Sequence, residues 1–190
     1  MSDIRTVYAS IGQDTVVVTP ISMLRVIASV GMRGKEFTPH FLKEFRPIAA
    51  LGEKDDPNYQ PARAGFGFQH PEPRIIEMDE KQWDLILKGM WGVVNNGGTA
   101  ASIRMPDLEI AGKTGTAQVA SLGKDSGKNK DHAWFDSFAP WDKPEIAVVS
   151  LIENSGFGAA NAGPAARGMY EKWLAKKNGG APNGQEVARK

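Results

Sequence analysis

The second half of the chain has three segments in which apolar and polar residues alternate, and this pattern constrains the fold more than any other feature. A period of two is typical of strands with one buried face. The segments cover residues 108–119, 132–138 and 145–153. Residues 140–144, which begin and end with proline, are typical of a hairpin turn, and residues 124–131 are typical of a polar loop. Consecutive strands with such connections predict a three-stranded antiparallel sheet.

Three other segments have the period of helices, with apolar residues three and four positions apart. They cover residues 20–30, 83–94 and 164–176. Thr19 before Pro20 is typical of a capped helix start, and Asp79 with Gln82 has the spacing of a capping box. We expect the last helix to begin at Pro164. Helices combined with an antiparallel meander predict the α+β class, with the sheet flanked by helices.

Length and local composition limit the domain organisation. A chain of 190 residues can bury one core but is short for two, so we expect one domain, or part of one, over residues 1–177. Residues 46–74 are rich in Pro, Gly, Asp and Asn, which predicts a long loop, and residues 178–190 predict a disordered tail. No apolar run approaches the ~20 residues of a membrane span, so we expect any membrane anchor to lie upstream of residue 1.

Charge and residue usage exclude several classes of function. The net charge is +1 and the basic residues are scattered, which argues against a nucleic acid partner. Cysteine is absent, which excludes disulfides, thiolate metal sites and a cysteine nucleophile. His40, His70 and His132 lie far apart, without the spacing of metal ligands. We therefore predict no metal and no cofactor.

The first predicted strand carries Lys113-Thr114-Gly115-Thr116. A glycine in a strand lets a ligand approach the backbone, whose N–H groups can then donate to a developing oxyanion. Lys113 would supply a fixed positive charge for a substrate carboxylate, and Thr114 and Thr116 would supply hydroxyl donors. The alternative interpretation is that these residues form only a polar strand end.

Two nucleotide-binding motifs are incomplete in this chain. Gly112-Lys113-Thr114 ends like a P-loop, but the position of the first glycine is occupied by Asp107, whose carboxylate would repel phosphate. Gly156 and Gly158 begin a dinucleotide fingerprint, but Asn161 replaces its last glycine and no parallel βαβ unit is predicted around it. We exclude both.

Lys-Thr-Gly is one of the short motifs of penicillin-binding proteins and class A β-lactamases, together with S-x-x-K and S-D-N. Further segments of the chain match class B penicillin-binding proteins in content and order: Ile11-Gly12-Gln13, Thr19-Pro20, Gly89-Met90, Val93-Val94, Gly98-Thr99, His132-Ala-Trp-Phe135, Phe138-Ala-Pro140, residues 146–153 and Gly163-Pro-Ala-Ala166. Over most of residues 8–175 the sequence resembles the C-terminal part of this family, especially its rod-elongation type. The resemblance implies part of the penicillin-binding, β-lactamase-like transpeptidase fold.

The resemblance implies a serine-type D,D-transpeptidase. In such an enzyme a serine attacks the D-Ala-D-Ala end of a peptidoglycan stem peptide and forms an acyl-serine intermediate, which an amine of a neighbouring strand resolves. β-Lactams acylate the same serine. The implied location is the cell envelope, at the periplasmic or extracytoplasmic face of the inner membrane.

The resemblance also implies roles for individual residues. The candidate catalytic residues are Lys113, Thr114, Gly115 and Thr116. Lys113 would sit on the strand that flanks the cleft, and Thr114 and Thr116 would hold the carboxylate of substrate or β-lactam. The backbone N–H of Thr116 would complete the oxyanion hole. Three further residues complete the candidate substrate-binding set: Gln118, His132 and Trp134. A structural role is the alternative for Trp134, because large aromatic side chains dominate cores.

The chain departs from the family pattern at the nucleophile. It has no S-x-N motif, and its S-x-x-K sequence, Ser121 to Lys124, follows the Lys-Thr-Gly triplet in a polar loop instead of preceding it at a helix start. We therefore expect a segment that carries the third motif, lacks its own nucleophile, has little activity alone and requires the upstream half of the transpeptidase domain. Such a segment would expose a sheet edge, which could support self-association.

Two other functions stay open. The chain could be a non-catalytic scaffold, or a module that binds peptidoglycan peptides without cleaving them. A relative of β-lactamases or carboxypeptidases is a further option because these enzymes share the triplet, although the residues flanking the triplet argue against it.

Overall fold

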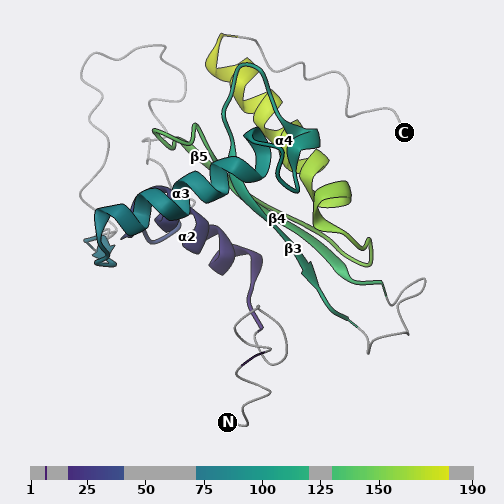
Figure 1. Cartoon of the computed structure of the whole chain (residues 1–190), viewed down its shortest axis with the longest axis horizontal. Helices are drawn as coiled ribbons and strands as arrows, with labels where there is room; N and C mark the ends of the chain where they lie inside the picture. The colour runs from purple at the N-terminus through teal and green to yellow at the C-terminus, as the bar shows by residue number, and fades with distance from the viewer. Residues whose placement is uncertain (1–6, 8–16, 41–71, 120–129, 180–190) are drawn as a thin grey trace, which may run out of the picture.

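The computed structural model describes residue 7 and residues 17–40, 72–119 and 130–179 (Figure 1). The described helices are α2 (Pro20–Gly31), α3 (Glu80–Asn95), the short 3-10 helix η2 (Ala101–Ile103) and α4 (Gly158–Lys177). The described strands are β1 (Lys35–Glu36), β2 (Arg74–Ile75), β3 (Ala111–Ala117), β4 (His132–Ala139) and β5 (Ile146–Ile152). The predicted α+β class, with an antiparallel sheet flanked by helices, is confirmed.

Strands β3, β4 and β5 form the predicted antiparallel meander, with β4 in the centre. β3 is shorter than the predicted segment 108–119. At one end Leu108 forms an isolated bridge with Met105, and at the other the Val119 N–H donates to the Asp131 carboxylate at 3.2 Å. The backbone thus finds other partners at both ends of the segment, and its strand pairing stops at Ala111 and Ala117.

The register of the sheet separates its residues into two faces. Ala111, Phe138 and Ala147 lie opposite one another and pack with Ile27 of α2. The intervening residues face α4: Phe135 and Val148 share a core cluster with Tyr170. Tyr170 also donates a hydrogen bond to Ser137 Oγ at 2.9 Å. Figure 1 shows α2 and α3 on one side of the sheet and α4 on the other.

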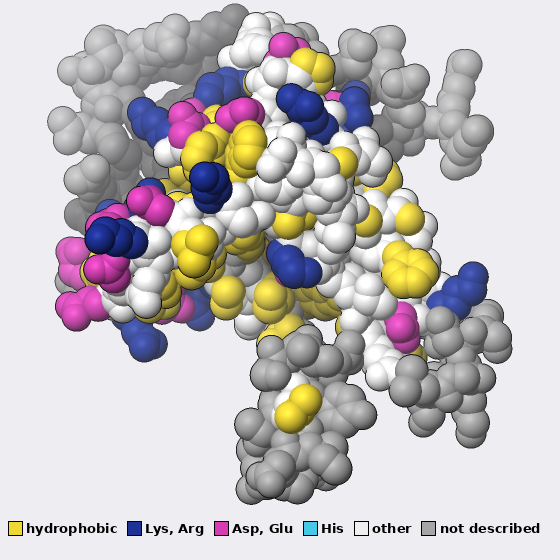
Figure 2. Space-filling model, in the orientation of Figure 1, with side chains coloured by type: hydrophobic (Ala, Val, Ile, Leu, Met, Phe, Trp, Pro, Cys, Tyr) yellow, Lys and Arg dark blue, Asp and Glu magenta, His cyan; other side chains and the backbone are white. Residues whose placement is uncertain are grey.

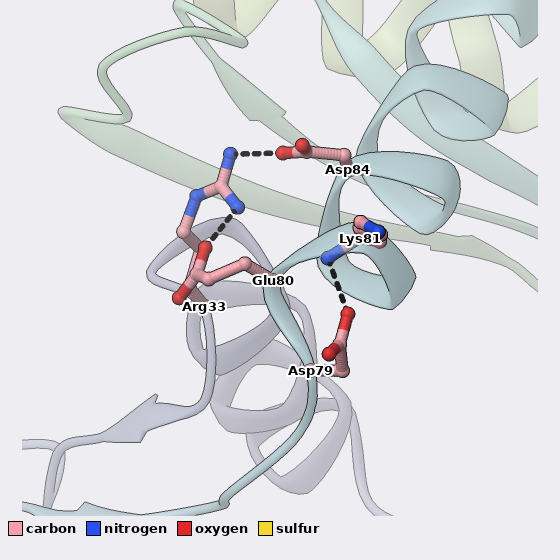
Figure 3. A network of polar contacts seen from close by, with 5 residues as sticks. All are labelled: Arg33, Asp79, Glu80, Lys81 and Asp84. Atoms are coloured by element: carbon pink, nitrogen blue, oxygen red, sulfur yellow. Dashed lines mark hydrogen bonds and ion pairs between the residues drawn. The ribbon is translucent and has the colours of Figure 1, made fainter.

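The predicted starts of the first two helices are confirmed, because both capping side chains are in use. The Thr19 hydroxyl accepts a hydrogen bond from the Ser22 N–H at 3.3 Å. The Asp79 carboxylate accepts one from the Lys81 N–H at 2.8 Å (Figure 3). Both caps therefore bind backbone N–H groups of the first helical turn, and the Ser22 N–H also donates to the Thr19 carbonyl oxygen at 3.0 Å.

Arg33 connects the turn after α2 to the first turns of α3 (Figure 3). Its guanidinium donates to Asp84 at 2.7 Å and to Glu80 at 2.8 Å. The hydrogen bond to Asp84 and the charges of both carboxylates raise the pKa of Arg33. Because all three side chains are exposed, each ion pair contributes at most about 1 kcal/mol to stability.

The prediction that Pro164 begins the last helix is wrong, because α4 begins at Gly158 and has Pro164 inside it. Gly158 lies against the backbone of the sheet: a Cβ there would be 2.3 Å from the Trp134 carbonyl oxygen and 2.4 Å from that of Gly115. This contact starts the helix on the sheet. The predicted end near Lys176 is confirmed to within one residue.

Two predicted irregular segments lie mostly outside the described residues. Of the predicted loop 46–74, only residues 72–74 are described, and Arg74 begins β2 instead of ending a loop, paired with Glu36. Of the predicted tail 178–190, Asn178 and Gly179 form a turn, and the rest lies outside the described residues. Within the described ranges, no helix combines the length and the apolar character that a membrane crossing requires.

Candidate functional site

The candidate site is built on β3, which is an outer strand of the sheet in the described part of the chain. The strand holds Lys113, Thr114, Gly115 and Thr116 in one continuous run, as predicted. Lys113 is exposed, and its ammonium donates to the carbonyl oxygen of Thr114 at 2.5 Å. No described strand pairs with the outer edge of β3, and an edge of this kind is where an extended ligand can add to a sheet.

Thr99 is a member of the site that sequence reasoning did not assign. Its hydroxyl lies 3.0 Å from that of Thr114, so the two form a hydroxyl pair at the edge of β3. The tight turn after α3 brings it there: a Cβ on Gly98 would be 2.4 Å from Val93 Cα, a distance that only glycine tolerates. Gly98-Thr99 was among the segments that carry the family resemblance, and this was the only signal in the sequence.

Asn95 holds the end of α3 against the start of β3. Its side-chain amide donates to the carbonyl oxygens of Trp91, in its own helix, at 2.9 Å and of Ile110, just before β3, at 2.8 Å. This bridge fixes the turn that carries Thr99 relative to the strand that carries Thr114.

Gly115 lies between two close neighbours. On the α2 side it is directly opposite Trp134, and a Cβ on Gly115 would be 3.1 Å from Trp134 Cβ. On the α4 side its backbone contacts Gly158. Trp134 is partly buried and covers the glycine, as aromatic residues commonly do across a strand pair. This packing is consistent with the structural alternative for Trp134.

The other predicted residues lie at the far end of the β3–β4 pair. Thr116 is opposite Ala133, and His132 is opposite Ala117. The imidazole Nδ1 of His132 accepts a hydrogen bond from the backbone N–H of Asn154 at 2.9 Å, so the ring supports the turn between β5 and α4. Gln118 follows the end of β3 and is exposed.

Asp136 introduces a carboxylate beside the predicted site. It lies directly opposite Lys113, on the α2 side of the sheet. Burial raises its pKa from 3.8 to about 6, and the positive charge of Lys113 opposes this effect. By the register, Lys113 and Asp136 lie on the α2 side of the sheet and Thr114 lies on the α4 side, where it pairs with Thr99, so β3 stands between the two charged groups and the two hydroxyls.

The described residues offer a cation and hydroxyl donors, which are groups that suit a carboxylate ligand. Ser121, of the one S-x-x-K sequence, lies outside the described residues. Lys113 and the Thr99–Thr114 pair are suited to holding an anionic, extended peptide end.

Comparisons with known proteins agree with this geometry. Residues 2–171 match the family of the penicillin binding protein transpeptidase domain. The peptidoglycan D,D-transpeptidase MrdA of Haemophilus influenzae is 32% identical over 179 residues, which cover 89% of this chain and 26% of that protein. The chain thus spans about a quarter of the length of the curated relatives it matches.

Solved structures of penicillin-binding proteins also resemble this chain. Pseudomonas aeruginosa PBP2, in complex with WCK 5153, is 28% identical with a TM-score of 0.64, and the match covers 97% of this chain and 35% of that one. Penicillin-binding protein A from Mycobacterium tuberculosis, an imipenem acyl-enzyme complex, supports the fold with a TM-score of 0.64 at 23% identity, over 88% of this chain and 33% of that one. The chain therefore belongs to the penicillin-binding protein transpeptidase family, as its resemblance to the class B, rod-elongation members predicted.

Proposed function

We propose that this chain is the C-terminal segment of a peptidoglycan D,D-transpeptidase, which cross-links stem peptides through an acyl-serine intermediate and is acylated by β-lactams. The observation that carries the proposal is the run Lys113–Thr116 on an outer strand, with its Thr114 hydroxyl paired to Thr99, in a chain that matches the family over residues 2–171. The proposed location is the cell envelope, where peptidoglycan is cross-linked.

In this proposal Lys113 contributes a positive charge beside the reacting serine. Thr114 and Thr116 bind the carboxylate of the D-Ala-D-Ala end or of a β-lactam. The Thr116 backbone N–H donates to the oxyanion that develops during acylation, an interaction worth roughly 3–4 kcal/mol in known cases. The substrate peptide lies along the open edge of β3, where its backbone can pair with the strand. Gln118, His132 and Trp134 complete the proposed substrate-binding set.

The nucleophile comes from the upstream half of the transpeptidase domain, which we propose as a partner of this segment. Large apolar side chains are exposed on the α2 and α3 side, which such a partner would cover: Ile21, Val26, Leu85 and Ile86. Figure 2 shows hydrophobic side chains at the surface over α3. Soluble proteins rarely leave large contiguous apolar patches exposed, so such a surface is typical of an interface.

Intact mass spectrometry after incubation with benzylpenicillin tests the proposal. We expect no covalent adduct on the isolated chain, and one adduct per molecule when the chain is joined to the upstream half of a transpeptidase domain. Lys113→Ala or Thr114→Val in the joined protein should slow acylation about 100-fold, which corresponds to the ~3 kcal/mol of a preorganised transition-state contact.

Lys143→Ala is the matched control, because Lys143 is an exposed lysine in the turn between β4 and β5. It should leave acylation unchanged. An adduct on the isolated chain would contradict the division of the site between two segments, and Ser121 would then be the first residue to replace. Wild-type acylation in Lys113→Ala would contradict the role of β3.

The absence of S-x-N and of a correctly placed S-x-x-K favours one second candidate, a non-catalytic scaffold or peptidoglycan-peptide binding module. This candidate predicts saturable, reversible binding of a D-Ala-D-Ala peptide with no adduct, even when the upstream half is supplied. Calorimetry with the peptide, paired with the mass measurement, separates the two functions.

A further inference from the structure

Asp136 occupies a position where a charged side chain is costly. On the α2 side of the sheet its neighbours along β4 and β5 include Phe138 and Val149, and α2 packs there through Ile27. Its Oδ1 atom is buried, and none of the described residues donates a hydrogen bond to it. Buried polar atoms without partners are rare in native structures, and each requires an explanation.

Lys113 is the charged group that faces this carboxylate. The two residues are directly opposite in the β3–β4 register, so their side chains leave the same face of the sheet. On the strand next to Asp136 away from Lys113, β5 places the apolar Val149 opposite it. On the same face of the sheet, α2 contributes three apolar residues to the surrounding cluster: Leu24, Ile27 and Val30. α3 contributes Leu87, Met90 and Trp91 to the same cluster. Within the described residues, the positive charge of Lys113 is the one that lowers the pKa of Asp136.

We infer that Asp136 is a positioning residue, whose ionised carboxylate holds the Lys113 ammonium over the α2 side of the sheet, where the proposed acyl-transfer site requires it. An ammonium has three donors, and one of them is used by the Thr114 carbonyl oxygen. The Asp136 carboxylate restrains the remaining freedom of the side chain, so that one donor still points to the substrate. This inference rests on the proposed function for the role of Lys113 in catalysis, whereas the interaction between Lys113 and Asp136 is inferred from their register and their opposite charges.

The protonation state of Asp136 should determine whether the Lys113 side chain is restrained. Burial raises its pKa to about 6, so the carboxylate is mostly protonated at pH 5 and mostly ionised at pH 7.5. A protonated Asp136 no longer attracts the ammonium, and the exposed lysine side chain then gains rotational freedom.

NMR titration of the full chain tests the pairing without any catalytic readout. The probe is the ¹³Cε chemical shift of Lys113 between pH 4.5 and 8. We expect a transition with its midpoint near pH 6 in the wild type, and its disappearance in Asp136→Asn. Asp84→Asn, which removes an exposed carboxylate paired with Arg33, should leave the transition in place. An unchanged transition in Asp136→Asn would overturn the inference.

Lys113→Met provides a second variant, in case Asp136→Asn does not fold. Because the Lys113 charge lowers the pKa of Asp136, its removal should move the titration of the Asp136 ¹³Cγ signal to higher pH. A titration that does not move would show that the two side chains are not paired, and would overturn the inference.

Acylation by benzylpenicillin tests the functional part in the protein joined to its upstream half. In the wild type the acylation rate should rise about tenfold between pH 5 and 7.5. In Asp136→Asn the rate should stay low and should not change with pH. In Asp136→Glu the rate should again rise with pH. A wild-type profile in Asp136→Asn would overturn the inference. If no variant is acylated, the proposed function fails instead, and the NMR titration decides whether Asp136 positions Lys113.

Discussion

At the residue scale, Asp136 is held where its ionised form is poorly solvated. Its pKa of about 6 means that the folded chain binds a proton more tightly than an ordinary aspartate, whose pKa is 3.8. Between about pH 4 and pH 6 the folded state therefore keeps a proton that the unfolded state releases. By linkage, stability falls as the pH rises through this window, and it stays lower above it.

Asp136→Asn should for this reason stabilise the chain at neutral pH. An amide keeps the size of the side chain but has no charge to desolvate. The full pKa shift of Asp136 corresponds to about 3 kcal/mol of unfolding free energy. Because the side chain is only partly buried, we expect Asp136→Asn to raise the free energy of unfolding by about 1–2 kcal/mol at pH 7.5.

Urea denaturation at pH 4 and pH 7.5 measures the effect. The gain in the free energy of unfolding should be present at pH 7.5 and absent at pH 4, where the wild-type aspartate keeps its proton. Asp84→Asn serves as the control because its carboxylate is exposed, and it should give no such gain. Equal effects of Asp136→Asn at both pH values would show that desolvation is not the cause.

The candidate site was predicted from the sequence only where its residues are contiguous. Lys113 to Thr116 form a recognisable motif, and the structure keeps them on one strand. Thr99 and Asp136 reach the site through the turn after α3 and through the strand register, and neither was assigned in advance. A period-two pattern identifies a strand but does not determine which residue lies opposite which.

At the element scale, helix starts were predictable where a capping side chain determines them. Thr19 and Asp79 both accept hydrogen bonds from the first turn of their helices. The start of α4 was missed because Phe157, at its cap position, makes no side-chain hydrogen bond. Contact of Gly158 with the sheet begins this helix, and such a tertiary contact leaves no local signal in the sequence.

Asp79→Ala tests the cap of α3. Loss of the carboxylate leaves the Lys81 N–H without its partner, so we expect a loss of about 1 kcal/mol in the free energy of unfolding. Chemical denaturation followed by circular dichroism measures it. Asp142→Ala, at an exposed aspartate outside any helix, should change stability by less than about 0.5 kcal/mol. A neutral Asp79→Ala would mean that solvent replaces the cap without cost.

At the scale of the whole molecule, exposed apolar side chains are distributed unevenly between the two sides of the sheet. Several lie on α2 and α3, whereas α4 has Met169 exposed among its larger apolar residues. β5 also has a described partner on one side only, so its outer edge can accept another strand. Both features fit the proposal that the upstream half of a transpeptidase domain packs against this chain.

Leu85→Glu tests the apolar side as the interface with the upstream half. Leu85 is 74% exposed, so the charge should not unfold the chain, but burying it at an interface should weaken association at least tenfold. Isothermal titration with the upstream half as a separate protein measures the affinity. Met169→Glu is the control on α4, where the side chain is 51% exposed, and it should leave binding unchanged. Equal effects of the two changes would contradict this assignment of the interface.

The contact of Gly158 with the sheet also limits which substitutions this sequence can accept during evolution. Any other residue would place a Cβ within 2.4 Å of the carbonyl oxygens of Trp134 and Gly115. A tolerated replacement would have to move α4 away from the strand that carries Lys113. In a library of random variants, position 158 should therefore accept only glycine among clones that keep the site intact, which makes the first residue of the last helix as restricted as the motif it lies against.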